Sequence, residues 1–368
     1  MTNSTASEAA PGICPAWPVY GLEAGIKRAR LEALLSQLTR HHAERCEAYR
    51  RILRARGVDW RDDFALERLP WLPVRLFKEA ELRSVDTAQV VKTLSSSGTT
   101  SARVSRIYLD RETSLAQSRA LVSILQTLLG RERLPMLILD HPGVIRDRVA
   151  FSARGAGILG LSTFGRNPVY ALKDGSMEID MDVVEQFAER YAGQRKLLFG
   201  FTFMAWKYFM QPLLAQARRL DLSQAILIHS GGWKKLLDEA VPPAVFKSAA
   251  RQAANIESVH NFYGMVEQAG SIFLECEAGH LHASSWSEVL VRDPFDWSLC
   301  PPGRQGLIQV MSVLPHSYPG HSLLTEDLGR LLGEDDCACG RHGKYFAVDG
   351  RLPRAELRGC SDTHAVPA

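Results

Sequence analysis

Short apolar runs alternate along the chain with segments of helical periodicity, and this alternation limits the possible folds more than any other feature of the sequence. The apolar runs have the length of buried strands and occupy 136–139, 197–201, 225–229, 289–291 and 307–313. Helical patterns occupy 22–56, 113–129, 182–192, 204–219 and 235–254. Strands that alternate with helices in this way predict an α/β fold with parallel or mixed sheets.

The composition is that of an ordinary soluble protein. The 368-residue chain is 46% apolar and 23% charged, and its net charge of +3 is too small to indicate a nucleic-acid partner. No apolar stretch approaches the roughly 20 residues that a membrane span needs. The first 13 residues lack the basic-then-apolar order of a secretory signal. We therefore expect a cytoplasmic enzyme with no membrane span.

A dense run of hydroxyl side chains lies between two β-like segments, 90–94 and 107–109. Its central residues are Ser95, Ser96, Ser97, Gly98, Thr99 and Thr100. Hydroxyl groups, together with the backbone N–H groups that a glycine leaves accessible, can bind the oxygens of a nucleoside triphosphate. A solvated Ser/Thr-rich turn or linker has the same composition, so the run alone does not decide between the two interpretations.

Four further motifs follow in order along the chain. They are His229–Trp233, which ends an apolar run, then Asn261–Glu267, Leu324–Asp327 and Asp349–Arg351. Each motif is weak by itself, whereas their occurrence together and in this order after the hydroxyl run is specific. This arrangement resembles the adenylate-forming superfamily, which contains acyl-CoA synthetases, firefly-type luciferases and the adenylation domains of peptide synthetases.

The resemblance implies ATP and Mg²⁺ as cofactors and assigns a role to each motif. The run from Ser95 to Thr100 holds the phosphates. The adenine is framed by Gly231, Gly232, Tyr263 and Gly264. Glu267 binds Mg²⁺, Asp327 binds the ribose hydroxyls, and Arg351 assists near the ribose and the α-phosphate. Taken alone, Glu267 or Asp327 could be a surface carboxylate, and Tyr263 could equally be a core aromatic residue.

The chain is most similar to one branch of this superfamily, the LuxE-type acyl-protein synthetases. The similar segments include Leu72–Lys78, Gly231–Lys234 and Leu314–His321, and the most specific one is Ala355–Thr363. This branch activates a carboxylic acid, typically a fatty acid, as an acyl-adenylate. It then transfers the acyl group to a cysteine of its own, for delivery to a reductase or another acceptor protein.

Cys360, in the sequence Gly359-Cys360-Ser361-Asp362, is the acyl-carrying cysteine that the resemblance implies. A thiolate is strongly nucleophilic, and the neighbouring Arg358 and His364 could lower the pKa of the Cys360 thiol. Gly359 permits close approach of the backbone to another surface. The alternative is an ordinary thiol in a C-terminal tail.

The resemblance also implies a domain organisation. We expect an N-terminal helical region at 1–70, packed on the main lobe, the adenylate-forming catalytic lobe at 71–352, and a short tail at 353–368 that carries Cys360. In the superfamily a mobile C-terminal lobe of about a hundred residues follows the Gly-Arg motif. Only 17 residues follow Arg351 here, too few to form a core, so we expect this lobe to be absent.

The seven cysteines, an odd number scattered through the chain, favour free thiols or metal ligands over a disulfide framework. Cys337 and Cys339 form one pair, and Cys276 with His282 forms a second, each beside a turn glycine. Together they could bind a tetrahedral structural Zn²⁺, as similar pairs do in relatives of the phenylacetate-CoA ligase type. His280 and Cys300 are possible substitutes as ligands. Ordinary reduced thiols are the alternative.

Two other functions stay open at this point. An acyl- or aryl-CoA ligase, or a ligase that loads a carrier protein, would pass its adenylate to an external thiol instead of Cys360. A non-catalytic nucleotide-binding module is the third interpretation, although it would not need both Glu267 and Asp327. The sequence leaves the identity of the acid, the final acyl acceptor and the oligomeric state undetermined.

Overall fold

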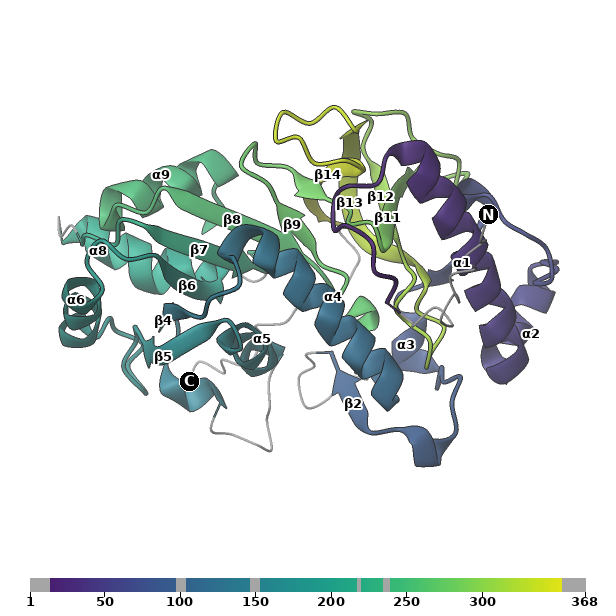
Figure 1. Cartoon of the computed structure of the whole chain (residues 1–368), viewed down its shortest axis with the longest axis horizontal. Helices are drawn as coiled ribbons and strands as arrows, with labels where there is room; N and C mark the ends of the chain where they lie inside the picture. Colours follow the sequence, from purple (N-terminus) through teal and green to yellow (C-terminus); the bar gives the residue numbers. More distant parts are fainter. Residues whose placement is uncertain (1–13, 97–103, 146–152, 217–219, 234–238, 353–368) are drawn as a thin grey trace, which may run out of the picture.

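The computed structural model describes residues 14–96, 104–145, 153–216, 220–233 and 239–352 (Figure 1). The helices are α1 (Ala24–Arg45), α2 (Glu47–Ala55), α3 (Leu76–Glu79), α4 (Arg111–Leu129), α5 (Ala153–Ser162), α6 (Met181–Arg190), α7 (Thr202–Met204), α8 (Gln211–Ala215) and α9 (Pro243–Ala254). No helix in these ranges has the length and hydropathy that a membrane crossing requires. Six of the seven cysteines lie in the described ranges, and all six are free thiols, as expected.

One mixed sheet of twelve strands dominates the described part of the chain. In spatial order its main path runs β11 (Ser287–Arg292), β12 (Gly306–Ser312), β13 (Ser322–Glu334), β14 (Lys344–Arg351), β10 (Leu281–His282), β9 (Phe273–Glu275), β8 (Ser258–Tyr263), β7 (Ala225–Ser230), β6 (Lys196–Phe201), β4 (Leu134–Ile138) and β5 (Gly165–Tyr170). The short β1 (Leu72–Pro73) pairs with β13. This confirms the predicted α/β class with a large mixed sheet flanked by helices.

The sheet has a parallel half and an antiparallel half. Strands β8, β7, β6, β4 and β5 are parallel, while β9 to β14 pair antiparallel to their neighbours. Figure 1 shows the parallel half with α6, α8 and α9 on one side of the molecule, and the antiparallel half with α1 and α2 on the other. The carboxyl ends of the parallel strands therefore meet at one edge, where α/β proteins commonly bind ligands.

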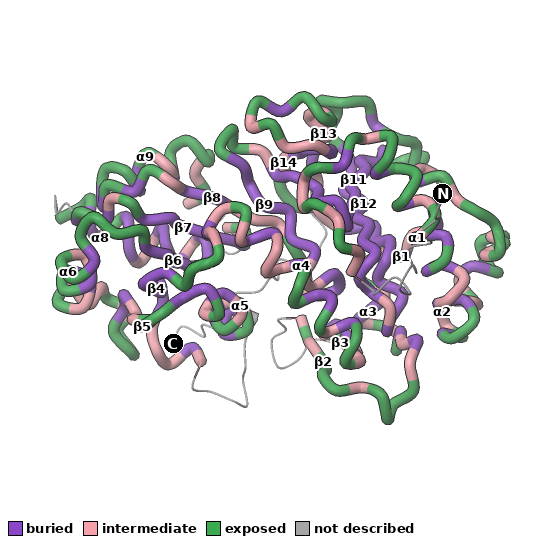
Figure 2. Tube along the Cα trace, in the orientation of Figure 1, coloured by how far each residue is buried: buried purple, intermediate pink, exposed green. Residues whose placement is uncertain are grey.

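Buried strands in the parallel half explain why their sequences are continuous apolar runs. All residues of β4, β6 and β7 are buried, as the tube in Figure 2 shows. Successive side chains point to opposite faces, so Leu197 and Phe199 join a core cluster with α1 and α4, whereas Leu198 joins another with α6 and α9. Helices on both faces thus cover the sheet.

Most predicted elements are confirmed, with two exceptions among the helices. The single helix expected over 22–56 is wrong, because the chain breaks at Cys46, whose φ of −118° and ψ of 101° are extended. The break turns α2 so that Tyr49 and Leu53 enter the core. The helix expected over 235–254 begins at Pro243, since proline lacks the N–H that an interior helical position must donate.

A two-stranded ribbon separate from the main sheet flanks the hydroxyl run. It consists of β2 (Lys92–Ser95) and β3 (Arg106–Leu109), which pair antiparallel with Ser95 opposite Arg106. The predicted β-like segments on either side of the run therefore form a hairpin. Ser97, Gly98, Thr99 and Thr100 lie outside the described residues.

Candidate active site and Cys/His cluster

Hydrogen bonds between Ser96 and Ser105 join the two ends of the expected phosphate loop. Beyond the last pair of the β2–β3 ribbon, the backbone N–H of Ser96 donates to the carbonyl oxygen of Ser105 at 3.2 Å. The Ser96 hydroxyl accepts from the Ser105 N–H at 2.9 Å. The hydroxyl run therefore emerges from a two-stranded stem, with Ser95 and Ser96 at its base. Whether the run binds phosphate stays a prediction.

Gly231 and Gly232 follow directly after β7, at the carboxyl edge of the parallel strands. Gly231 has a φ of 83°, which residues with a Cβ rarely adopt, and an added Cβ would lie 3.1 Å from the Phe201 ring. A Cβ at Gly232 would meet no atom of the described residues within 4 Å. The backbone conformation of the turn thus favours glycine at the first position.

Tyr263 and Asp327, which are 64 residues apart in sequence, are in direct contact. The Tyr263 hydroxyl donates to Asp327 Oδ2 at 2.7 Å. Arg351 is the register partner of Asp327 across β13 and β14, and its Nε lies 3.6 Å from Asp327 Oδ1. We call Tyr263, Asp327 and Arg351 the ribose cluster. Burial raises the pKa values of Tyr263 and Asp327, and Arg351 acts in the opposite direction on both.

Glu267 is a buried carboxylate next to this cluster. It lies four residues after Tyr263, in the short 3₁₀ turn Val266–Gln268. Burial raises its pKa, and the Ser105 hydroxyl and the positive charges of Lys78 and Arg351 act in the opposite direction. Arg351 therefore acts electrostatically on both Asp327 and Glu267. A buried carboxylate with incomplete charge compensation suits a divalent cation such as Mg²⁺.

The position of Glu267 is fixed by its neighbours. The Gln268 side-chain amide donates to the carbonyl oxygens of Gly320 at 2.8 Å and Val310 at 3.2 Å. A Cβ at Gly320 would lie 2.8 Å from the carbonyl oxygen of Glu267, so only glycine allows this approach. Gly264, just after β8, similarly packs close to Ile272.

The register of the sheet connects the glycine pair with the ribose cluster. Ser230 pairs with Phe262 across β7 and β8, and its hydroxyl donates to the Phe262 carbonyl oxygen at 2.9 Å. Gly231 and Tyr263 are the residues that follow this pair. The sheet register thus places Gly231 next to the strand end that carries Tyr263, which contacts Asp327. No interaction of the described residues tests the individual assignments to adenine, ribose or Mg²⁺.

Sequence analysis missed one charged group at the same edge. Asp140 and His141 follow β4, and Asp140 Oδ2 lies 3.0 Å from Nε of the buried Arg154. His141 Nδ1 is 2.8 Å from Asp174 Oδ1. The signal was present in the sequence, because polar residues directly after a buried parallel strand reach the ligand-binding edge.

A second cluster lies at the turns around β9, β10 and the end of β13. The four predicted zinc ligands, Cys276, His282, Cys337 and Cys339, place one ligand atom each within 4.8 Å of one another. We call these four residues the Cys/His cluster.

The distances within the Cys/His cluster fit a tetrahedral Zn²⁺. The Sγ atoms of Cys276 and Cys337 are 3.9 Å apart, and Cys339 Sγ is 3.4 Å from His282 Nε2. Zn–S bonds of about 2.3 Å in a tetrahedron require ligand atoms separated by about 3.8 Å. His280, a possible substitute, lies nearby with its Nδ1 3.4 Å from Cys337 Sγ. Cys300 instead contacts the Gln305 carbonyl oxygen.

Cys360, the predicted acyl-carrying residue, lies outside the described residues, as does the whole tail 353–368. The strand that leads toward it, β14, ends at Arg351 within that cluster.

Comparison with solved structures identifies the fold. The open conformation of 2-hydroxyisobutyryl-CoA ligase in complex with 2-HIB-AMP and CoA has a TM-score of 0.69 at 16% identity, covering 90% of this chain and 71% of that chain. The same ligase in the thioesterification state gives 0.67 at 17% identity, covering 91% and 70%. ATP-bound MatB from Rhodopseudomonas palustris has a TM-score of 0.48 at 18% identity, covering 73% and 49%.

The sequence comparisons identify the family. No curated protein matches the chain. The family model described as acyl-protein synthetase, LuxE, matches residues 7–366, which is nearly the whole chain. The sequence motifs, the mixed sheet and this match agree with one another. The chain therefore belongs to the LuxE family of acyl-protein synthetases.

Proposed function

We propose that this protein activates a carboxylic acid, preferably a fatty acid, with ATP and transfers the acyl group to its own Cys360. The observation that carries the proposal is the contact between Tyr263, Asp327 and Arg351 beside the buried Glu267. These residues come from three separate segments of the chain and meet at Tyr263, which ends β8 at the carboxyl edge of the parallel strands. Membership of the LuxE family supports the same reaction.

In the first step, an oxygen of the substrate carboxylate attacks the α-phosphorus of ATP, and pyrophosphate leaves. Asp327, held by the Tyr263 hydroxyl, binds the ribose, and Arg351 stabilises charge near the α-phosphate. The hydroxyl run from Ser95 to Thr100 binds the remaining phosphates. Glu267 would hold Mg²⁺, which supplies charge neutralisation on the phosphates.

In the second step, the Cys360 thiolate attacks the acyl carbonyl carbon of the adenylate. The bond to the phosphate oxygen breaks, AMP leaves, and the acyl group remains as a thioester on the protein. A reductase or a carrier protein would accept the acyl group from there.

We further propose that the Cys/His cluster binds a structural Zn²⁺. Its residues fasten the turn after β9, the strand β10 and the turn after β13 to one another. It contains only three thiols and one imidazole, and neither the ribose cluster nor Glu267 belongs to it. Bracing of the antiparallel half, rather than catalysis, is the role that this position supports.

The decisive experiment combines radiolabelled fatty acid with ATP and the full-length protein. We expect label on the protein that survives denaturing gels, is released by neutral hydroxylamine and disappears in Cys360→Ala. Cys14→Ala, which removes a half-buried thiol elsewhere, is the control and should keep the label. Pyrophosphate exchange should persist in Cys360→Ala, because adenylation precedes the attack of the Cys360 thiolate. Persistent labelling of Cys360→Ala would disprove transfer to this residue.

A CoA ligase is the second candidate, because the similar ligase structures were solved with CoA. In that case the acyl-adenylate would react with the CoA thiol, and acyl-CoA would be released without labelling of the protein. Adding CoA to the same reaction separates the two functions. CoA-dependent product with an unlabelled protein would favour the ligase.

A further inference from the structure

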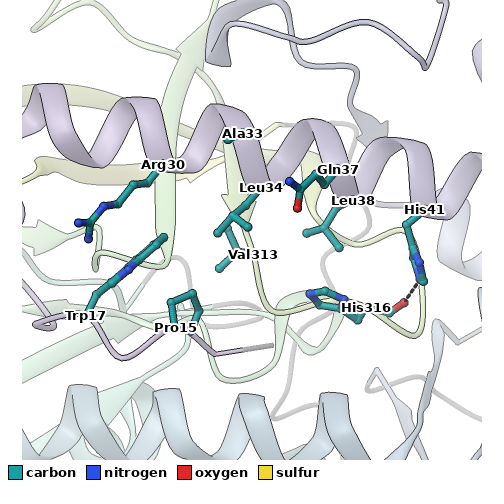
Figure 3. Close-up of a pocket in the computed structure, with 10 residues that line it drawn as sticks. All are labelled: Pro15, Trp17, Arg30, Ala33, Leu34, Gln37, Leu38, His41, Val313 and His316. Carbon is teal, nitrogen blue, oxygen red and sulfur yellow. Dashed lines mark hydrogen bonds between the residues drawn. The ribbon is translucent and has the colours of Figure 1, made fainter. Parts of the chain in front are cut away.

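A groove runs beneath α1, between this helix, the N-terminal segment around Trp17 and the loop that follows β12 (Figure 3). Its volume is about 520 Å³, within the range of about 300–1,000 Å³ that is typical of small-molecule sites. The lining residues include none of the residues assigned above to nucleotide or zinc. The groove is therefore a candidate binding site of its own.

The groove is long and apolar in its middle. Arg30 and His41, at its two ends, are eleven positions apart on α1, which corresponds to about 16 Å of helix. Figure 3 shows Arg30 and Trp17 at one end, His41 and His316 at the other, and Leu34 and Val313 between them. An unbranched aliphatic chain is the kind of ligand that such a shape accommodates.

The two ends of the groove differ in charge. Arg30 is the only charged residue among the described residues that line the groove, and its guanidinium lies over the Trp17 ring at 5.3 Å. Within the described ranges, no carboxylate forms an ion pair with Arg30. At the other end, His41 Nε2 donates to the His316 carbonyl oxygen at 2.9 Å. Burial lowers the pKa of His316 to about 4, so this end is uncharged at neutral pH.

We propose that this groove binds an aliphatic carboxylate, with the carboxylate at Arg30 and the hydrocarbon chain along Leu34, Leu38 and Val313. One cation at the end of an apolar channel complements an anion at the end of an apolar chain. Among the described residues of the lining, none is acidic, so none would repel such a ligand. The site is additional to the one that activates the acid, and it requires no nucleotide.

Calorimetric titration of the nucleotide-free, full-length protein with monomeric saturated fatty acids, from decanoate to hexadecanoate, tests the proposal. Affinity should rise about two- to fourfold per methylene until the groove is filled, because each buried methylene adds apolar contact. The alcohol of the same length should bind about tenfold more weakly, because it lacks the charge that Arg30 pairs with. Absence of binding, or affinity that does not depend on chain length, would overturn the proposal.

Two variants locate the site. Leu34→Trp fills the middle of the groove and should weaken binding at least tenfold, while Leu214→Trp, on the exposed face of α8, should not. Arg30→Gln should remove the preference for the carboxylate over the alcohol. Binding that keeps wild-type affinity in Leu34→Trp would place the ligand outside the groove and refute the proposal.

Discussion

The Cys/His cluster and the ribose cluster are built in opposite ways. The first lies on β10 and at the turns after β9 and β13, and the second lies on β8, β13 and β14. In the Cys/His cluster, four ligand atoms converge on one point within 4.8 Å, and the geometry is complete once a single ion is bound. Around the ribose cluster, Tyr263 and Asp327 satisfy each other, whereas Glu267 is buried with its pKa raised. In our proposal, the first arrangement braces the fold through a bound ion, and the second keeps a buried carboxylate for a cation that arrives with the nucleotide.

This difference separates stability from activity in the molecule. A substitution in the Cys/His cluster should reduce the free energy of unfolding, whereas one at Glu267 should reduce activity without reducing stability.

The largest effect is expected for Cys337→Ser, which removes one of the four proposed ligands. Zinc content should fall from one per chain to near zero, and the free energy of unfolding should decrease by about 3–5 kcal/mol. Metal analysis and denaturant unfolding measure the two effects. Cys300→Ser is the matched control, because Cys300 is equally buried, at 7% exposure, but lies outside the cluster. Equal effects of both substitutions would contradict a metal site.

Glu267→Gln should lower the rate of carboxylate-dependent pyrophosphate exchange about a hundredfold, because the neutral amide cannot hold Mg²⁺ against the phosphates. The measurement is exchange of labelled pyrophosphate into ATP at saturating Mg²⁺. Glu257→Gln, at an exposed surface ion pair with Arg251, serves as the control. Normal exchange in Glu267→Gln would remove this residue from the proposed mechanism.

Tyr263→Phe keeps the aromatic ring and deletes only the hydroxyl that donates to Asp327. We expect the KM for ATP to rise about tenfold with little change in kcat, because a ribose contact acts equally on bound substrate and transition state. Steady-state exchange kinetics separate the two constants. If kcat decreases and KM stays constant, the hydroxyl acts in the chemical step instead of in binding.

The smallest effect concerns the pH dependence of stability in Glu267→Gln without ligands. Burial raises the pKa of the Glu267 carboxyl in the folded state, so this group contributes to the stability of wild type while it is protonated. The contribution is complete below about pH 4.3, the pKa of an unfolded glutamate, and is lost as the pH rises through the raised folded-state pKa. Glutamine cannot ionise, so the variant should match wild type near pH 4 and be more stable than wild type at pH 8. Thermal unfolding at the two pH values measures the difference. A variant less stable than wild type at pH 8 would show that the carboxylate stabilises the apo fold.

The sequence predicted which residues belong to each site better than it predicted the contacts between them. Spacing alone placed Cys276 near His282 and Cys337 near Cys339, because short turns restrict where close neighbours can go. The α/β class followed from apolar runs whose residues are all buried in β4, β6 and β7. Both predictions depend only on residues that are close together in the sequence.

Contacts between distant segments could not be predicted in the same way. The hydrogen bond from Tyr263 to Asp327 depends on the order in which β8, β9, β10, β14 and β13 join the sheet, which no pattern in either motif encodes. The break between α1 and α2 at Cys46 carries no proline or glycine that would reveal it in the sequence. It depends instead on how Tyr49 and Leu53 of α2 pack in the core. The groove beneath α1 likewise needs Trp17 and Val313 to meet across the chain.

The thirteen-residue strand β13 joins the two clusters physically. Asp327 lies near its middle, and Cys337 follows three residues after its end at Glu334. Neighbouring strands can change their alignment only by whole residues, and a slip of one residue turns every side chain to the opposite face. An ion bound at the turn after β13 would therefore keep Asp327 paired with Arg351. Removal of that ion by a chelator should then weaken the affinity for ATP, although the ion contacts no substrate.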